Sequence, residues 1–391
     1  MARPPSIYLD HAAATPLHPE VEAAVAEAQA IAYANPSSQH AAGRMARRLL
    51  EEARERIVEL LGGQGGGVHR DRLVFTSGAS EANRLAILGM AAAAAPAGDL
   101  FFSRRDHPSS VHAVLTVSRQ GWRLHELGLD ATTGLVRTAA SAAIVQRGAT
   151  GPRIVSLTLV CGQTGSIEDL SPFGGGHMTG VFVHVDATQG AGLLPLVFRD
   201  LPAATLSLAP HKFGGPRGIG GLVIRSGVAL EPVQAGTQEQ GLRGGTESVP
   251  LAVGFARALE LAAADREHAA VRVAGLRDRL ETRLIDVAQR AGIEARVIAA
   301  HATRCPHIAT IAFPGLDRQA LAMAADLAGV CLATGTACTS GSSEPAPALV
   351  AMGLEPEVVR GAVRLSVGPM TTAADIDHAV ERLTPLFTQP A

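Results

Sequence analysis

Short apolar runs alternate with helical stretches over the first part of the chain. Six of the runs have the length and composition of buried strands: residues 72–76, 99–103, 154–160, 181–185, 205–208 and 219–224. A helical pattern follows the first of them, from Glu81 to about Ala95. Because apolar runs without strict alternation are typical of strands buried on both faces, the pattern predicts a parallel or mixed sheet with helices on either side.

A different pattern begins at Val249. Helical periodicity, with arginine and glutamate on the polar side, continues to about Ala291 and is typical of a spine that joins two lobes. Beyond it come a strand (308–313), a helix, a second strand (363–367) and a closing helix from Thr372 to about Leu386. This order predicts a smaller α+β lobe, and 391 residues are enough for two or three lobes.

Composition narrows the class of protein. Hydrophobic residues make up 47% of the chain and charged residues 18%, which provides for a large core and argues against disorder. The formal charge of −2 offers no positive surface for nucleic acid or an anionic membrane, and no apolar run reaches the roughly 18 residues of a membrane span. The first ten residues lack the apolar segment of a signal peptide, so we expect a cytoplasmic protein.

The four cysteines, Cys161, Cys305, Cys331 and Cys338, are widely spaced and form no CxxC motif. This spacing argues against a disulfide framework and against a zinc site, so no metal is expected. It is typical of a reduced compartment, where a special cysteine serves chemistry more often than structure.

Lysine is almost absent from the chain. The 34 basic residues include a single lysine, Lys212, and all the others are arginine. An arginine can replace a lysine on a surface, but a guanidinium cannot form an imine with an aldehyde. Lys212 is therefore a candidate for covalent attachment of a cofactor, although its chance survival on the surface is the plain alternative.

Three features at predicted strand ends favour the cofactor. The turn Ser77-Gly78-Ala79-Ser80 joins a strand to a helix, where free backbone N–H groups and the helix dipole favour a phosphate. Asp186 follows the strand at residues 181–185, and His211-Lys212 follows the next strand. A phosphate cup, a buried carboxylate for a pyridine nitrogen and an amine for an aldehyde are together what pyridoxal 5′-phosphate requires.

Several motifs in order along the chain resemble the cysteine desulfurases of the class V aminotransferase group, which are pyridoxal-phosphate enzymes of fold type I. The matching segments are Tyr8-Leu-Asp-His-Ala-Ala-Ala-Thr-Pro16, Asn35-Pro-Ser-Ser38, Phe75-Thr-Ser-Gly-Ala-Ser-Glu-Ala-Asn83, His184-Val-Asp-Ala-Thr-Gln189, His211-Lys212, Arg243-Gly-Gly-Thr-Glu247, Gly335-Thr-Ala-Cys-Thr-Ser340 and Arg364-Leu-Ser-Val-Gly368. The stretch from Cys338 to Arg364 resembles the long-loop (group I) branch.

This resemblance implies an α/β fold of two domains. The large domain, at residues 15–255, is expected to hold a mostly parallel seven-stranded sheet sandwiched by helices and to bind the cofactor. The smaller α+β domain is expected to combine residues 1–14 with 256–391 and to carry the loop with the catalytic cysteine. The resemblance also implies a homodimer with shared sites.

The roles of individual residues are likewise implied by the resemblance. His107 would stack on the pyridine ring and assist proton transfer, Asp186 would pair with the pyridine nitrogen, and Gln189 would hydrogen-bond the phenolic oxygen. Lys212 would bind the aldehyde carbon and move the proton at the substrate Cα. The phosphate would be held by Ala79, Ser80 and His211, and by Thr246 of the other protomer.

On the substrate side, the resemblance implies that Asn35 contacts the substrate and that Arg364 clamps its carboxylate. Cys338 would attack the sulfur of L-cysteine, so that L-alanine leaves and a persulfide on Cys338 passes to an acceptor protein or thiol, as in iron–sulfur cluster assembly. The other three cysteines would be core or incidental residues.

Two positions depart from the family pattern. Cys161-Gly162-Gln163 stands where the family usually has two asparagines and an acid, and Ala209 replaces a serine that usually supports the phosphate. Both changes favour a lower activity or an altered substrate. The alternatives to a desulfurase are therefore a related C–S lyase or aminotransferase acting on another amino acid, and a weakly active sulfur-relay scaffold.

Overall fold

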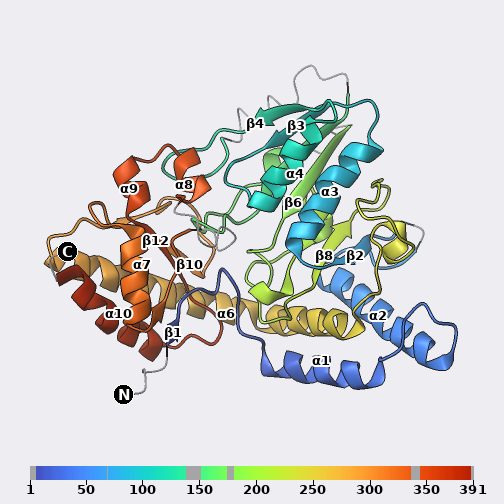
Figure 1. Cartoon of the computed structure of the whole chain (residues 1–391), viewed down its shortest axis with the longest axis horizontal. Helices are drawn as coiled ribbons and strands as arrows, with labels where there is room; N and C mark the ends of the chain where they lie inside the picture. The colour runs from blue at the N-terminus through green and yellow to red at the C-terminus, as the bar shows by residue number, and fades with distance from the viewer. Residues whose placement is uncertain (1–5, 68, 138–150, 174–179, 336–343, 389–391) are drawn as a thin grey trace.

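The computed structural model describes residues 6–67, 69–137, 151–173, 180–335 and 344–388 (Figure 1). A seven-stranded sheet forms the centre of the larger lobe. Its strands, in spatial order, are β2 (Arg72–Thr76), β8 (Gly220–Ile224), β7 (Thr205–Leu208), β6 (Val181–Asp186), β5 (Arg153–Thr158), β3 (Asp99–Phe102) and β4 (Arg123–Glu126). Only β8 runs antiparallel to its neighbours, so the prediction of a mostly parallel seven-stranded sheet is confirmed.

Helices cover both faces of this sheet (Figure 1). On one face lie α3 (Ala79–Ala93) and α4 (Pro108–Ser118), and on the other lie α1 (Pro19–Ile31), α2 (Ala41–Leu60) and the first half of α6 (Val249–Arg290). The strand residues alternate between the two layers, as the two-residue period of a strand requires. In β2, for example, Leu73 and Phe75 join the core under α2 and α6, whereas Val74 joins the core under α3.

The smaller lobe has a hydrophobic core of its own, which combines the first strand with residues beyond 270. Its elements are β1 (Ile7–Tyr8), β9 (Arg296–Val297), β10 (Ile308–Ala312), α7 (Arg318–Leu327), β11 (Val330–Cys331), α8 (Pro347–Ala351), α9 (Pro356–Arg360), β12 (Ala362–Ser366) and α10 (Ala373–Thr388). β10 lies between β12 and β9 in an antiparallel sheet, and β1 pairs with β11 in parallel.

Helix α6 runs unbroken through both lobes (Figure 1). Its first half packs on α1 and α2, and its second half packs on α10 and β10. The predicted domain boundary at residues 255–256 falls inside this helix. The predicted division of the chain into residues 15–255 and the remainder therefore stays a prediction.

A buried ion pair anchors the loop that precedes α6. Arg54 of α2 donates hydrogen bonds of 2.7 and 3.0 Å to the two carboxylate oxygens of Glu239, and Glu239 also accepts the backbone N–H of Phe75 at 2.8 Å. The side chains of Arg54 and Glu239 are 8% and 1% exposed. Glu239 and Gln240 both have positive φ angles, so this contact holds the loop in a conformation that non-glycine residues rarely adopt.

Arg54→Met is expected to lower the free energy of unfolding by about 3 kcal/mol, because it leaves the Glu239 carboxylate buried without its cation. Denaturant unfolding followed by circular dichroism measures the change. Arg48→Met, on the same helix, is the matched control: its partner Glu52 is exposed, and the expected change is below about 0.5 kcal/mol. Equal losses in the two variants would contradict a structural role for the buried pair.

Candidate active site

A cavity of about 360 Å³ opens at the carboxyl ends of β5 and β6 and reaches to the smaller lobe. This is the edge at which α/β sheets commonly bind ligands. Most of the site residues predicted from the sequence line it together: Ala79, Ser80, His107, Asp186, Gln189, His211, Lys212 and Arg364. The cavity volume falls in the range usual for cofactor sites, roughly 300–1,000 Å³.

Three predicted site residues are not among them. Within the part of the chain that the structure describes, Asn35 and Thr246 are exposed and do not line the cavity. Asn35 instead accepts a hydrogen bond from the backbone N–H of Ser37 at 2.8 Å. Cys338 lies outside the described residues. The roles of these three residues stay predictions.

Asp186 is held in place at the end of β6 by the side-chain amide of Asn83, for which the sequence predicts no role. Asn83 of α3, fully buried, donates through Nδ2 to Asp186 Oδ2 at 2.8 Å, and the backbone N–H of Thr188 donates to Asp186 Oδ1 at 3.0 Å. His184 donates through Nε2 to Asn83 Oδ1 at 3.0 Å. These contacts leave the Asp186 carboxylate fixed at the cavity wall, as a partner of a pyridinium nitrogen would have to be.

The same asparagine reaches His107. Asn83 Nδ2 lies 3.1 Å from Ser109 Oγ, and Ser109 Oγ lies 2.7 Å from His107 Nδ1. The His107 ring also caps α4 by accepting the backbone N–H of Ser109. One buried side chain therefore links the carboxylate and the imidazole that line the cavity.

Lys212 ends a short 3₁₀ turn (Pro210–Lys212) that follows β7. Its Nζ donates to the carbonyl oxygens of Ala12 and Ala13 at 2.7 and 2.8 Å, so the chain segment that leads into α1 holds the amine at the cavity. Burial, together with the Lys212 and Arg217 charges, lowers the pKa of the neighbouring His211 to about 4, which keeps that imidazole neutral. Ala209, one of the two departures from the family pattern, is buried just before this turn.

Arg364 of β12 brings a cation from the smaller lobe. Its Nη2 donates to Asp10 Oδ1 at 2.7 Å and its Nη1 to the carbonyl oxygen of Gly162 at 2.8 Å. Its Nε is buried and has no partner in the described part of the chain. A guanidinium with an unused N–H at a cavity wall suits a carboxylate ligand.

The turn before α3 has the shape of an anion cradle. Gly220 of β8 packs so closely that an added Cβ would lie 2.4 Å from the carbonyl carbon of Gly78, so only glycine allows this approach. Glu81 accepts the backbone N–H of Ser77 at 2.6 Å and Nε of Arg243 at 2.9 Å, which fixes the turn from behind. The turn and the first residues of α3 line the cavity, where a phosphate would complement the helix dipole.

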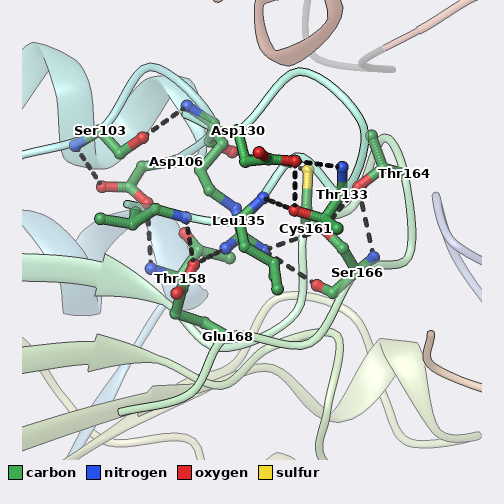
Figure 2. A network of polar contacts seen from close by, with 12 residues as sticks. Ser103, Asp106, Asp130, Thr133, Leu135, Thr158, Cys161, Thr164, Ser166 and Glu168 are labelled. Carbon is green, nitrogen blue, oxygen red and sulfur yellow. Dashed lines mark hydrogen bonds and ion pairs between the residues drawn. The ribbon is translucent and has the colours of Figure 1, made fainter. Parts of the chain in front are cut away.

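A buried network of polar contacts (Figure 2) shares Thr158 with the lining of the cavity. Arg105 pairs with Glu168 and donates to the carbonyl oxygen of Ser166 at 2.9 Å. Asp106, next to His107 in the chain, accepts the backbone N–H of Thr158 at 3.0 Å, and burial raises the pKa of Asp106 to about 7. The network ties the start of α4 to β5 and to the turn at 161–168, which carries Gly162.

The residues present fit pyridoxal phosphate. Lys212 and Asp186 stand at the same cavity as the cradle at Gly78–Ser80, and Thr188 offers the cavity a buried hydroxyl that has no partner in the described residues. No group of three metal-ligating side chains occurs within these residues, and no helix within them is both long and apolar enough to cross a bilayer.

Comparisons with known proteins match nearly the whole chain. The sequence profile of the family Aminotransferase class-V matches residues 7–379. A cysteine desulfurase from Cereibacter sphaeroides is 36% identical, over 98% of this chain and 96% of its own. Two solved structures are 25% identical: a NifS-like protein from Rickettsia africae (TM-score 0.87, 98% of this chain, 99% of that one) and SspA in complex with cysteine (TM-score 0.76, 94% and 100%).

Proposed function

Because the chain belongs to the class V aminotransferase family and, within it, is a pyridoxal-phosphate-dependent cysteine desulfurase, we propose that Lys212, Arg364 and Cys338 divide the work of converting L-cysteine to L-alanine. The observation that carries this assignment is the meeting of Lys212, Asp186 and Arg364 at one cavity. Bound cofactor supplies an electron sink for the negative charge that develops at the substrate Cα.

Each side chain then has a task that its position supports. Arg364 holds the substrate carboxylate through its Nε–H, which has no partner within the described residues. Lys212 takes the proton from the substrate Cα and returns it later, because its amine is the only lysine amine of the chain and already lies at the cavity wall. Asp186, fixed by Asn83 and Thr188, supplies the negative charge that keeps a pyridine nitrogen protonated.

The sulfur step belongs to Cys338. Its thiolate forms an S–S bond to the substrate sulfur while the substrate C–S bond breaks and the carbon keeps the electron pair. Protonation of that carbon yields alanine, and the persulfide on Cys338 passes to an acceptor protein or thiol. We assign the acceptor to a sulfur-consuming route such as iron–sulfur cluster assembly.

An amino-acid panel tests this function against its alternatives. With L-cysteine and a reductant, a desulfurase releases alanine and sulfide in equal amounts. A keto acid in place of alanine would indicate an aminotransferase, and a preference for an S-substituted cysteine would indicate a C–S lyase, which the missing side chain at Gly162 favours. Bound cofactor with unconsumed cysteine would indicate a sulfur-relay scaffold.

We also propose a homodimer in which Asn35 and Thr246 serve the site of the partner subunit. Both residues are exposed and stand away from the cavity of their own chain, which is where residues that act across an interface would lie. Light scattering measures the mass in solution. If the protein is a dimer, mixing Lys212→Ala and Thr246→Ala subunits should restore activity above that of either variant alone, and a strictly monomeric active enzyme would contradict the assignment.

The cytoplasm is the compartment that we propose. The described cysteines, Cys161, Cys305 and Cys331, are all free thiols, as a reducing compartment allows. Fractionation of cells that express the tagged chain tests this assignment, which recovery of the protein outside the cytoplasm would contradict.

Asp186→Asn is expected to slow alanine formation about a hundredfold while the cofactor still binds, because the amide cannot stabilise a protonated ring nitrogen. The rate of alanine formation and the visible absorption of the bound cofactor separate the two effects. Asp200→Asn, an exposed change of the same type, should keep the wild-type rate. Turnover near that of the wild type in Asp186→Asn would show that Asp186 has only a structural role.

A further inference from the structure

Three side chains in hydrogen-bond contact, Cys305, His307 and Gln189, lead from the smaller lobe to the cavity, and the function proposed above does not use the first two. Cys305 Sγ lies 3.2 Å from His307 Nδ1, and His307 Nε2 lies 3.1 Å from Gln189 Oε1. Gln189 Nε2 then donates to the carbonyl oxygen of Ala12 at 2.8 Å. Cys305 is fully buried and His307 is 5% exposed.

The carbonyl of Ala12 sets the direction of the hydrogen bonds that link Gln189, His307 and Cys305. A carbonyl oxygen can only accept, so the amide nitrogen of Gln189 must be the atom that faces it. Oε1 of Gln189 therefore faces His307 and needs a donor, which places the hydrogen of the imidazole on Nε2. His307 Nδ1 is then an acceptor, and the thiol of Cys305 is the donor that it finds.

The charge states of Cys305 and His307 agree with this direction. Burial and the nearby charges of Arg364, Lys212, His11 and Arg277 together lower the pKa of His307 to about 3, so the ring carries one hydrogen and not two. Burial raises the pKa of Cys305 to about 12, so the thiol keeps its hydrogen. The backbone oxygen of Gln189, at 3.7 Å from the same sulfur, is the more distant acceptor.

We propose that His307, held by Cys305, is a positioning residue that fixes the amide of Gln189 with its N–H₂ group toward the cavity. One hydrogen of that group goes to Ala12, whose carbonyl oxygen also accepts Lys212 Nζ. The second hydrogen is left for a ligand oxygen beside the lysine. Gly162 provides the room, because an added Cβ there would stand only 3.3 Å from Gln189 Nε2.

This inference rests on the proposed function, since the ligand oxygen that the amide meets is the phenolic oxygen of pyridoxal phosphate. A fixed donor withdraws charge from that oxygen and so lowers the pKa of the lysine nitrogen bound beside it. Without His307 the amide can rotate, and the donor is lost for part of the time. The pH at which the visible band of the holoenzyme changes is therefore the property that His307 controls.

The first measurement uses the cofactor-free protein. Nitrogen-15 NMR of histidine-labelled wild type should show His307 as a single neutral tautomer with the hydrogen on Nε2 and no titration between about pH 5 and 8. Its signal is identified by the shift that Cys305→Ser causes. A hydrogen on Nδ1, or a titration within this range, would overturn the inference whether or not the protein binds the cofactor.

The second measurement follows the visible band of the holoenzyme against pH. His307→Leu should raise the midpoint by about one pH unit, as expected for the loss of one hydrogen bond to a charged group. His307→Gln, which can still donate to Gln189, should stay within about 0.3 unit of the wild type. Cys305→Ala should move the midpoint in the same direction but less, and Cys305→Ser should not move it.

An unchanged midpoint in a His307→Leu protein that binds the cofactor would overturn the positioning role. If His307→Leu does not fold, the two Cys305 variants and the tautomer of His307 in the wild type test the proposal in its place. Equal midpoints in Cys305→Ala and Cys305→Ser would contradict a role for the Cys305 thiol. A wild-type protein without a visible band would contradict the proposed function, and the tautomer measurement would still test the inference.

Discussion

Lys212→Arg is expected to abolish the visible absorption of the protein incubated with pyridoxal phosphate and to lower alanine formation by at least about a thousandfold. The guanidinium keeps the positive charge and can still reach the carbonyls of Ala12 and Ala13, but it cannot form a covalent bond to the aldehyde carbon. An absorption spectrum and an alanine assay on the same sample measure both effects.

Because Lys212 is the only lysine of the chain, a covalent label on a lysine side chain identifies this residue. Borohydride reduction of the wild type should place the pyridoxyl label on the peptide that contains Lys212 and at most also on the amino terminus. Arg217→Lys, the reverse change at an exposed position five residues away, is the matched control and should keep both the band and the activity. A coloured, reduced sample with an unlabelled Lys212 peptide would disprove the assignment.

The second large effect is expected at Cys338. Cys338→Ser should still bind cysteine, seen as a change in the visible spectrum, but should release sulfide at least about a hundredfold more slowly, because a serine hydroxyl cannot attack sulfur as a thiolate does. Mass spectrometry of the wild type after brief exposure to cysteine without reductant should find one added sulfur on the Cys338 peptide. Transamination and elimination need no thiolate, so this variant separates the desulfurase from its alternatives.

Serine at the other cysteines provides the comparison. Cys161 and Cys305 are fully buried and Cys331 lies on β11, so each replacement should leave most of the activity. If Cys338→Ser consumed its best substrate at the wild-type rate, the lyase or aminotransferase would replace the desulfurase, with the same cofactor and the same lysine.

The strands that position the site were predictable because they are buried on both faces. The predicted run at residues 72–76 is β2, and the run at 181–185 is β6, which includes Asp186 as its last residue. β4 was not predicted, because Arg123–Glu126 is an edge strand of mostly polar, half-exposed residues and gives no apolar run. Its place in the sheet follows from parallel pairing with β3.

The contacts behind the site residues could not be predicted in the same way. Asn83 and Asp10 stand inside matching motifs, but their partners, Asp186 and Arg364, lie 103 and 354 positions away, and no local pattern encodes such pairings. The sequence predicts Cys305 only as a core or incidental residue, because a thiol beside an apolar run gives no sign of its contact with the His307 imidazole. Asn35 was expected at the substrate site and does not line the cavity of its own chain, whereas Thr246 was expected at the site of the other protomer, and both roles stay predictions.

The unbroken course of α6 has a mechanical consequence. With 42 residues and a rise of about 1.5 Å each, the helix is about 60 Å long, and it packs on both lobes as one continuous element. A wide hinge motion between the lobes would have to bend α6 and break some of its internal hydrogen bonds, and this cost in free energy disfavours wide opening. The spacing between Lys212 on one lobe and Arg364 on the other is thereby preset before any substrate arrives, and little of the binding energy of the substrate has to be spent on closing the protein around it.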